Sequence, residues 1–224
     1  MSSNLIRNML ISAGLLGFFG ALGTSMVLGI HQVTKEKIDA NIKANLLKSL
    51  NTIIPAQSYN NDLLQSTIQI PVSSLLGNDN ATTVYQAKRD NKPVAVAFDI
   101  TAPDGYSGDI NILIAIKANG DISGVRIISH KETPGLGDKI EATRSDWITK
   151  FSDKSLKDPD EKQWKVKKDG GVFDQFTGAT ITPRAIVKAV HNALLYFQDN
   201  RKLLFLEQKE YDLLNPPKLV KQES

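Results

Sequence analysis

Residues 170–190 read GGVFDQFTGATITPRAIVKAV, and the second half of this stretch predicts a helix. Thr182 is expected to cap its N-terminus, because a threonine hydroxyl can accept a hydrogen bond from a free backbone amide. Pro183 then takes the first helical position, where its fixed φ suits the helix. The apolar residues that follow recur at helical spacing and predict one buried face, formed by Ile186, Val187, Val190, Leu194 and Phe197.

Four residues directly ahead of this helix, Thr177, Gly178, Ala179 and Thr180, place two hydroxyls around two residues with almost no bulk. Backbone amides and the helix dipole at a helix N-terminus favour a phosphate group. The plainer interpretation is a strand-to-helix turn whose hydroxyls cap backbone groups. The wider context favours the anion site, because Asp174 completes the pattern Asp-x-x-Ser/Thr-Gly-Ala-Thr.

A second motif, HKETPGLG at residues 130–137, follows a predicted strand. Gly135 and Gly137 permit close backbone approach and Pro134 stiffens the loop, so its main chain is suited to contact a flat aromatic ring. His130 invites an acid–base role. A lone histidine at a strand end is more often a structural hydrogen-bonding group, and that is the interpretation favoured here.

These two motifs resemble the FMN-binding domain family that the G subunit of the Rnf (Rsx) electron-transport complex shares with the C subunit of the sodium-translocating NADH:quinone reductase. The resemblance covers nearly the whole chain and is closest to the Rnf protein. A weaker third match is GYSG at residues 105–108, where Tyr106 either stacks on the flavin ring or packs in the core. In this family the last threonine of the first motif carries FMN through a phosphoester bond, so the resemblance implies that Thr180 is the FMN acceptor.

The resemblance also implies the surroundings of the FMN. Asp174 falls at the acidic position of the pattern that a dedicated flavin transferase reads. The implied cofactor contacts are a phosphate site and a loop that borders the ring, formed by Thr177, Gly178 and Ala179 and by Glu132, Thr133, Pro134, Gly135, Leu136 and Gly137. No residue is assigned a catalytic or metal-binding role.

Composition limits the possible functions. Of the 224 residues, 41% are hydrophobic and 23% are charged, which indicates a globular chain rather than a disordered one. The formal charge of +3 is mild and there is no basic run interleaved with aromatic residues, so nucleic-acid binding is not supported. The absence of cysteine excludes thiolate-bound iron–sulfur clusters and dithiol chemistry. A redox role must therefore rest on a bound organic cofactor.

The segment from residue 8 to residue 30 has no charged residue and is long enough to span a membrane as a helix. A cleaved signal peptide is the alternative. The apolar run is long for a signal sequence and no small-residue cleavage site follows it, so a retained anchor is favoured. Charge does not decide the orientation, because basic residues lie on both sides of the span and the segment that follows is long. The resemblance implies a single-pass protein of the bacterial inner (cytoplasmic) membrane with its soluble domain on the periplasmic side.

The predicted organisation is a short N-terminal segment (1–7), a transmembrane helix (8–30), an amphipathic connecting helix (31–55), an FMN-binding domain (56–200) and a charged tail (201–224). Strands are expected at 83–87, 93–100, 110–117 and 124–129, where apolar and β-branched residues lie between turn signals such as Asn119-Gly120. A helix is expected within 138–151 and a solvated excursion at 152–168. The fold class is α+β, with a single N-terminal transmembrane helix and an antiparallel sheet with flanking helices.

The resulting hypothesis is a membrane-anchored flavoprotein subunit that relays electrons through covalent FMN in an ion-translocating complex of the Rnf type, without substrate turnover of its own. Its expected partners are the other subunits of that complex, the membrane, and a flavin transferase during maturation. Two alternatives stay open: the equivalent subunit of the sodium-pumping NADH:quinone reductase, and a membrane-tethered assembly module with no cofactor.

Overall fold

The computed structural model describes residues 2–216, without the side chains of residues 2–6, 29–33, 36 and 39. The chain divides into two units, one ending at residue 46 and one beginning at residue 47. Helix α1 (Ser2–Ile53) is continuous, so no break separates the predicted span from the predicted connecting helix. Within α1, Arg7–Leu28 is long and apolar enough to cross a membrane, close to the predicted 8–30.

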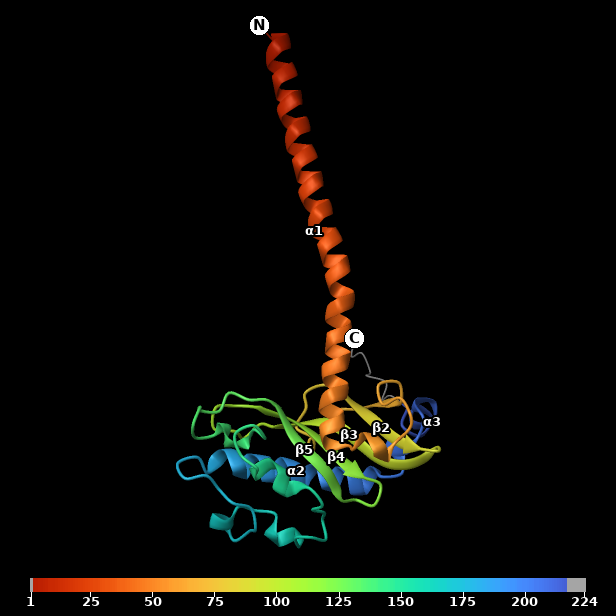
Figure 1. The fold of residues 1–224 in the computed structure, drawn as a ribbon, viewed down its shortest axis with the longest axis vertical. Coiled ribbons are helices and arrows are strands. Elements are labelled where there is room, and N and C mark those ends of the chain that lie inside the picture. Colours follow the sequence, from red (N-terminus) through yellow and green to blue (C-terminus); the bar gives the residue numbers. More distant parts are fainter. Residues whose placement is uncertain (1, 217–224) are drawn as a thin grey trace, which may run out of the picture. The chain divides into compact units, whose positions relative to one another are not determined.

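The second unit is built on a five-stranded antiparallel sheet (Figure 1). Its strands lie in sequence order: β1 (Thr67–Ile70), β2 (Thr82–Arg89), β3 (Lys92–Ala102), β4 (Ile110–Lys117) and β5 (Ile122–Ser129). The four predicted strands are confirmed as β2 to β5. Strand β1 was not predicted, because only two of its four residues are apolar and no turn signal marks them.

Helix α2 (Ile181–Asn200) packs on one face of this sheet, where Tyr196 meets Phe98 of β3 edge-on at a ring distance of 6.5 Å (Figure 1). The predicted apolar face is confirmed, since all five of its residues are buried. The predicted N-cap is wrong. The helix begins at Ile181 after Thr180, so Thr182 lies inside the first turn and Pro183 is the third helical residue. Pro183 is still tolerated there, because amides of the first turn lack an intrahelical acceptor.

The last turn of α1 covers part of the opposite face of the sheet. Leu50, Ile53 and Ile54 are buried, and the Ser123 hydroxyl of β5 donates to the Ile53 carbonyl at 2.6 Å. Gly124 permits this approach, because a Cβ atom there would lie 3.0 Å from the Ile53 backbone. The apolar face predicted for the connecting helix is therefore buried only at its end. Ile38 and Ile42 are 50% and 59% exposed.

The helix expected within residues 138–151 is present as two short 3-10 helices, Asp138–Ile140 and Trp147–Phe151. The expectation of a solvated excursion at 152–168 is wrong in part, because Trp164 and Val166 are buried. Val166 packs in the hydrophobic core, and Trp164 belongs to an aromatic cluster in that core formed by Trp147, Phe151, Trp164, Phe173 and Phe176. Phe176 directly precedes the Thr177–Thr180 motif, so this cluster anchors the motif to the core.

The segment after α2 folds back onto the domain as far as it is described. A 3-10 helix at Leu203–Phe205 and helix α3 (Gln208–Leu214) bury Leu204 and Tyr211. The Gln86 side-chain amide of β2 donates to the carbonyls of Leu204 and Leu206 at 2.9 and 2.7 Å. This part of the predicted tail thus packs on β1 and β2, and residues 217–224 of it lie outside the described residues.

His191 of α2 is expected to make a pH-dependent contribution to stability. Its ring stacks on Trp164 at 5.6 Å, and within the described residues its Nε2 atom is buried without a hydrogen-bond partner. Burial lowers the pKa of His191, and Glu161 opposes that effect. An unfolded histidine titrates near pH ~6.5. The unfolded state therefore binds the proton more readily, and the free energy of unfolding falls as the pH drops below that value.

We expect His191→Phe to reduce this pH dependence, because phenylalanine keeps the ring contact and cannot be protonated. Urea unfolding of the detergent-solubilised protein, followed at about pH 7.5 and 5.5, measures the effect. Stability should fall less in the variant than in the wild type. An equal fall in both proteins would show that His191 is not the responsible group.

Candidate cofactor site

Three segments far apart in the sequence form one cavity of about 580 Å³ at the N-terminus of α2. They are the GYSG turn, the loop after β5, and the stretch that leads into the helix. The lining residues are Tyr106, Glu132, Thr133, Leu136, Gly137, Gly178, Ala179, Thr180, Ile181 and Thr182. The cavity thus joins all three motifs of the sequence analysis, which lie up to seventy-six residues apart.

Thr180 occupies the residue before α2 and lines this cavity. In the described structure its side chain makes no capping hydrogen bond to the helix. The plainer interpretation of the motif required such a cap. The hydroxyl is therefore free for chemistry beside the orphan backbone amides of the first helical turn. Gly178 has a φ of +84°, a conformation that side chains other than glycine rarely adopt, and this sharp turn aims the chain into the helix.

Glu132 is a buried carboxylate, 4% exposed, at the point where the three segments meet. The Ser107 backbone amide donates to its Oε1 atom at 2.9 Å, and the Thr182 hydroxyl donates to its Oε2 atom. Thr182 is therefore part of the site rather than a helix cap. The sequence analysis missed this role because no local pattern links Thr182 to a residue fifty positions earlier.

Gly137 is required by packing on Glu132 and not by backbone conformation. Its φ is −86°, which any residue adopts, but a Cβ atom there would lie 2.9 Å from the Cβ atom of Glu132. Gly105 is similarly confined, since a Cβ atom would lie 2.2 Å from the Gly108 carbonyl oxygen and 3.0 Å from Glu132 Oε1. One glycine of each motif, Gly105 and Gly137, thus permits the close packing of this carboxylate.

Four predicted site residues do not line the cavity: Asp174, Thr177, Pro134 and Gly135. Asp174 instead forms ion pairs with Lys167 at 2.5 Å and Lys150 at 3.2 Å. Hydrogen bonds from these two lysines hold the pKa of Asp174 below its usual value. Its backbone carbonyl accepts a hydrogen bond from the Trp147 indole at 2.7 Å. Asp174 is therefore a half-exposed, ion-paired residue that does not line the cavity.

His130 has a structural environment. Its Nδ1 atom accepts a hydrogen bond from the Glu132 backbone amide at 3.0 Å. The proton of the neutral ring therefore lies on Nε2, which donates a hydrogen bond to the Glu141 carboxylate at 2.9 Å. The hydrogen bond from His130 is the main cause of the lowered pKa of Glu141. With both nitrogens occupied by protein partners, His130 orients the loop and is not free for acid–base chemistry. This agrees with the interpretation favoured from the sequence.

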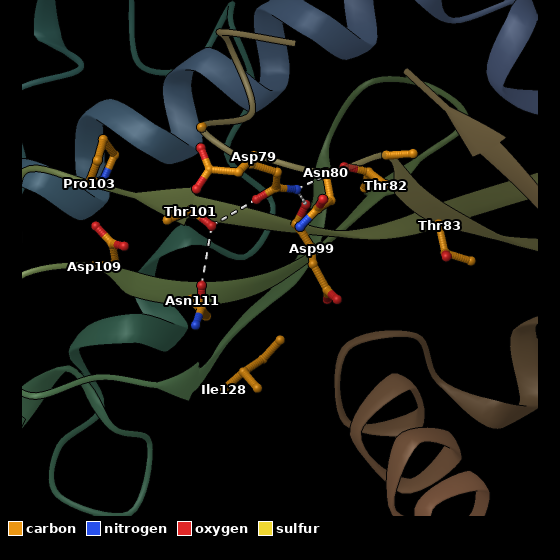
Figure 2. A pocket seen from close by; sticks show the side chains of 13 residues that line it. Asp79, Asn80, Thr82, Thr83, Asp99, Thr101, Pro103, Asp109, Asn111 and Ile128 are labelled. Atoms are coloured by element: carbon orange, nitrogen blue, oxygen red, sulfur yellow. Dashed lines mark hydrogen bonds between the residues drawn. The ribbon is translucent and has the colours of Figure 1, made fainter. Parts of the chain in front are cut away.

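A second cavity of about 540 Å³ lies on the side of the sheet away from α2, beside the loop at residues 77–81 and the start of β2 (Figure 2). Asp79, Asp99 and Asp109 line it, but Figure 2 shows their carboxylates apart from one another. No group of three or more acidic, histidine or cysteine side chains within residues 2–216 is placed to hold a metal ion. The cavity contains no residue of the three motifs, so it does not compete with the site at α2.

The cavity at α2 fits a flavin nucleotide. Its volume lies within the range of about 300–1,000 Å³ that small-molecule sites occupy. One end offers the Thr180 hydroxyl and the helix N-terminus, which suit a phosphate. The rim carries three partly exposed apolar or aromatic side chains that suit a flat ring, since Tyr106, Leu136 and Ile181 are 68%, 43% and 44% exposed.

Comparison with known families and proteins agrees with this geometry. The family described as FMN-binding domain matches residues 105–195, which contain every lining residue, and the family described as RnfG N-terminal region matches residues 1–53. Curated relatives named as the G subunit of an ion-translocating oxidoreductase complex include one from Shewanella oneidensis, 45% identical over 92% of this chain and 95% of the relative. A relative from Pseudomonas aeruginosa is 44% identical over 91% of this chain and 95% of the relative. A relative from Vibrio atlanticus is 44% identical over 86% of this chain and 91% of the relative. The chain therefore belongs to the family of the G subunit of the ion-translocating oxidoreductase complex.

Proposed function

We propose that this protein is the membrane-anchored flavoprotein subunit of an Rnf-type ion-translocating oxidoreductase complex, and that Thr180 carries its FMN. The observation that carries the proposal is the Thr180 hydroxyl, which caps no backbone amide in the described structure and lines a cavity shared by all three motifs. When bound, FMN would accept and pass on electrons singly or in pairs. The protein would relay electrons between its partners without turnover of a substrate of its own.

Different residues of the cavity would bind the phosphate and the ring of the cofactor. The free amides at the start of α2 and the helix dipole favour a phosphate at Thr180. Leu136 and Ile181 offer apolar contact, and Tyr106 offers an aromatic face. A covalent tether keeps the cofactor at an effective concentration that can reach the millimolar range, so it is retained even where free FMN is scarce. Asp174, which is half-exposed, remains available to a flavin transferase.

Denaturing gel electrophoresis tests this function. The full-length protein, produced in cells with a flavin transferase, should give a band that fluoresces as a flavin after denaturation. Protein from cells without the transferase should give a dark band of equal protein content. A dark band in both cases would favour the cofactor-free assembly module, which the sequence analysis left open.

We further propose that the Arg7–Leu28 segment of α1 is a retained membrane anchor and that the residues after Gln32 lie on the periplasmic side. Added trypsin should then digest the domain in intact spheroplasts. A cytoplasmic marker protein should stay intact until the cells are lysed. Full protection of the domain before lysis, with digestion afterwards, would place it in the cytoplasm.

A further inference from the structure

Glu132 joins the three segments that form the cavity. Its two oxygens accept hydrogen bonds from Ser107 and Thr182, which lie 25 residues before it and 50 residues after it. Both partners are donors, an arrangement that suits an ionised carboxylate with no proton of its own. The buried Glu132 side chain therefore connects the GYSG turn to the first turn of α2 through these two hydrogen bonds.

Two glycines pack closely against the carboxylate of Glu132. Gly105 and Gly137 pack on it so closely that an added Cβ atom would lie 3.0 Å from Oε1 in the first case and 3.0 Å from Oε2 in the second. Its position is thus fixed by both hydrogen bonds and packing.

No cation neutralises this charge within the described part of the chain. Glu132 is the one aspartate, glutamate, lysine or arginine that lines the cavity. Two basic residues of neighbouring segments pair with other carboxylates, Lys188 with Asp104 at 2.6 Å and Arg144 with Asp138 at 3.6 Å, and Lys131, adjacent to Glu132 in sequence, is exposed to solvent. Because Glu132 is shielded from water, salt screens its field less than the field of a surface charge.

We propose that Glu132 is a positioning residue whose fixed negative charge lowers the midpoint potential of the flavin in this cavity. This inference rests on the proposed function. A reduced flavin carries more electron density than an oxidised one, and a negative charge beside the site opposes that gain. Glu132 would thus make the bound flavin a stronger electron donor, while itself exchanging neither electrons nor protons.

Three variants of the full-length, flavin-loaded protein in detergent test this inference. Glu132→Gln removes the charge and keeps the shape, since the glutamine carbonyl can accept from Ser107 and its amide can donate to the Thr182 oxygen. Glu132→Asp keeps the charge. The matched control is Glu141→Gln, which removes the same charge from a half-exposed side chain that does not line the cavity. The measurements are intact mass, circular dichroism and the flavin midpoint potential.

Glu132→Gln should raise the midpoint potential, whereas Glu132→Asp and Glu141→Gln should leave it close to the wild-type value. The inference is overturned if the potential of Glu132→Gln does not rise, or if that of Glu132→Asp rises as far. If Glu132→Gln fails to fold, a raised potential in Glu132→Asp, which keeps the charge, would still overturn the inference. Absence of flavin from the wild-type protein is a separate result, seen in the intact mass, and would overturn the proposed function together with this inference.

Discussion

The Thr180→Val variant is expected to lose all covalently bound flavin while keeping the fold of the domain. Valine has nearly the shape of threonine but has no oxygen that could form the phosphoester. The fold should survive, because the Thr180 hydroxyl makes no capping hydrogen bond in the described structure. In-gel fluorescence of the denatured variant, produced together with the flavin transferase, should fall to background, and its far-UV circular dichroism should match that of the wild type.

A control for this experiment makes the same substitution outside the cavity. Thr143 is exposed, and its hydroxyl bonds the nearby carboxylate of Glu141 at 3.1 Å. Thr143→Val should keep full fluorescence. Fluorescence of a denatured Thr180→Val band would place the attachment at another residue.

Phe151→Ala is expected to produce the largest loss of stability in the domain, about 3–5 kcal/mol. Phe151 is fully buried and stacks on Phe173 with a ring distance of 4.7 Å. It also meets Trp147 edge-on at 5.3 Å, and Trp147 in turn contacts Phe176, the residue before the Thr177–Thr180 motif. The cavity left by alanine would therefore loosen the support of the motif as well as the core.

Urea unfolding followed by tryptophan fluorescence measures this loss. Leu213→Ala is the control, because Leu213 is 81% exposed and its removal should change the free energy of unfolding by less than about 0.5 kcal/mol. An equally small change for Phe151→Ala would mean that the segment between β5 and α2 does not depend on the aromatic cluster.

Patterns that act over a few residues allowed much of the fold to be predicted. The β-branched runs gave β2 to β5, and helical spacing gave the buried face of α2 from Ile186 to Phe197. The burial of a side chain by residues far away in the sequence could not be predicted from such local patterns. Trp164 and Val166 sit in a run rich in lysine and aspartate, and only the core residues brought to them by the fold explain why they are buried.

The site shows the same division. The Thr177–Thr180 and Glu132–Gly137 motifs were each visible in the sequence, and they do meet in one cavity. The bond between Glu132 and Thr182 was not predictable, because Thr182 followed by Pro183 has the local pattern of a helix cap. The reason for Gly137 was also hidden. The sequence predicted that Gly137 would contact a flavin ring, whereas in the structure this glycine packs against the Glu132 side chain.

Intact-mass analysis of the full-length protein, made in a host that contains the flavin transferase, tests the central claim most directly. The predicted mass is that of the chain plus one FMN less one water, with the added mass on the peptide that contains Thr180. A mass equal to that of the unmodified chain, or an FMN located on a peptide without Thr180, would contradict the assignment.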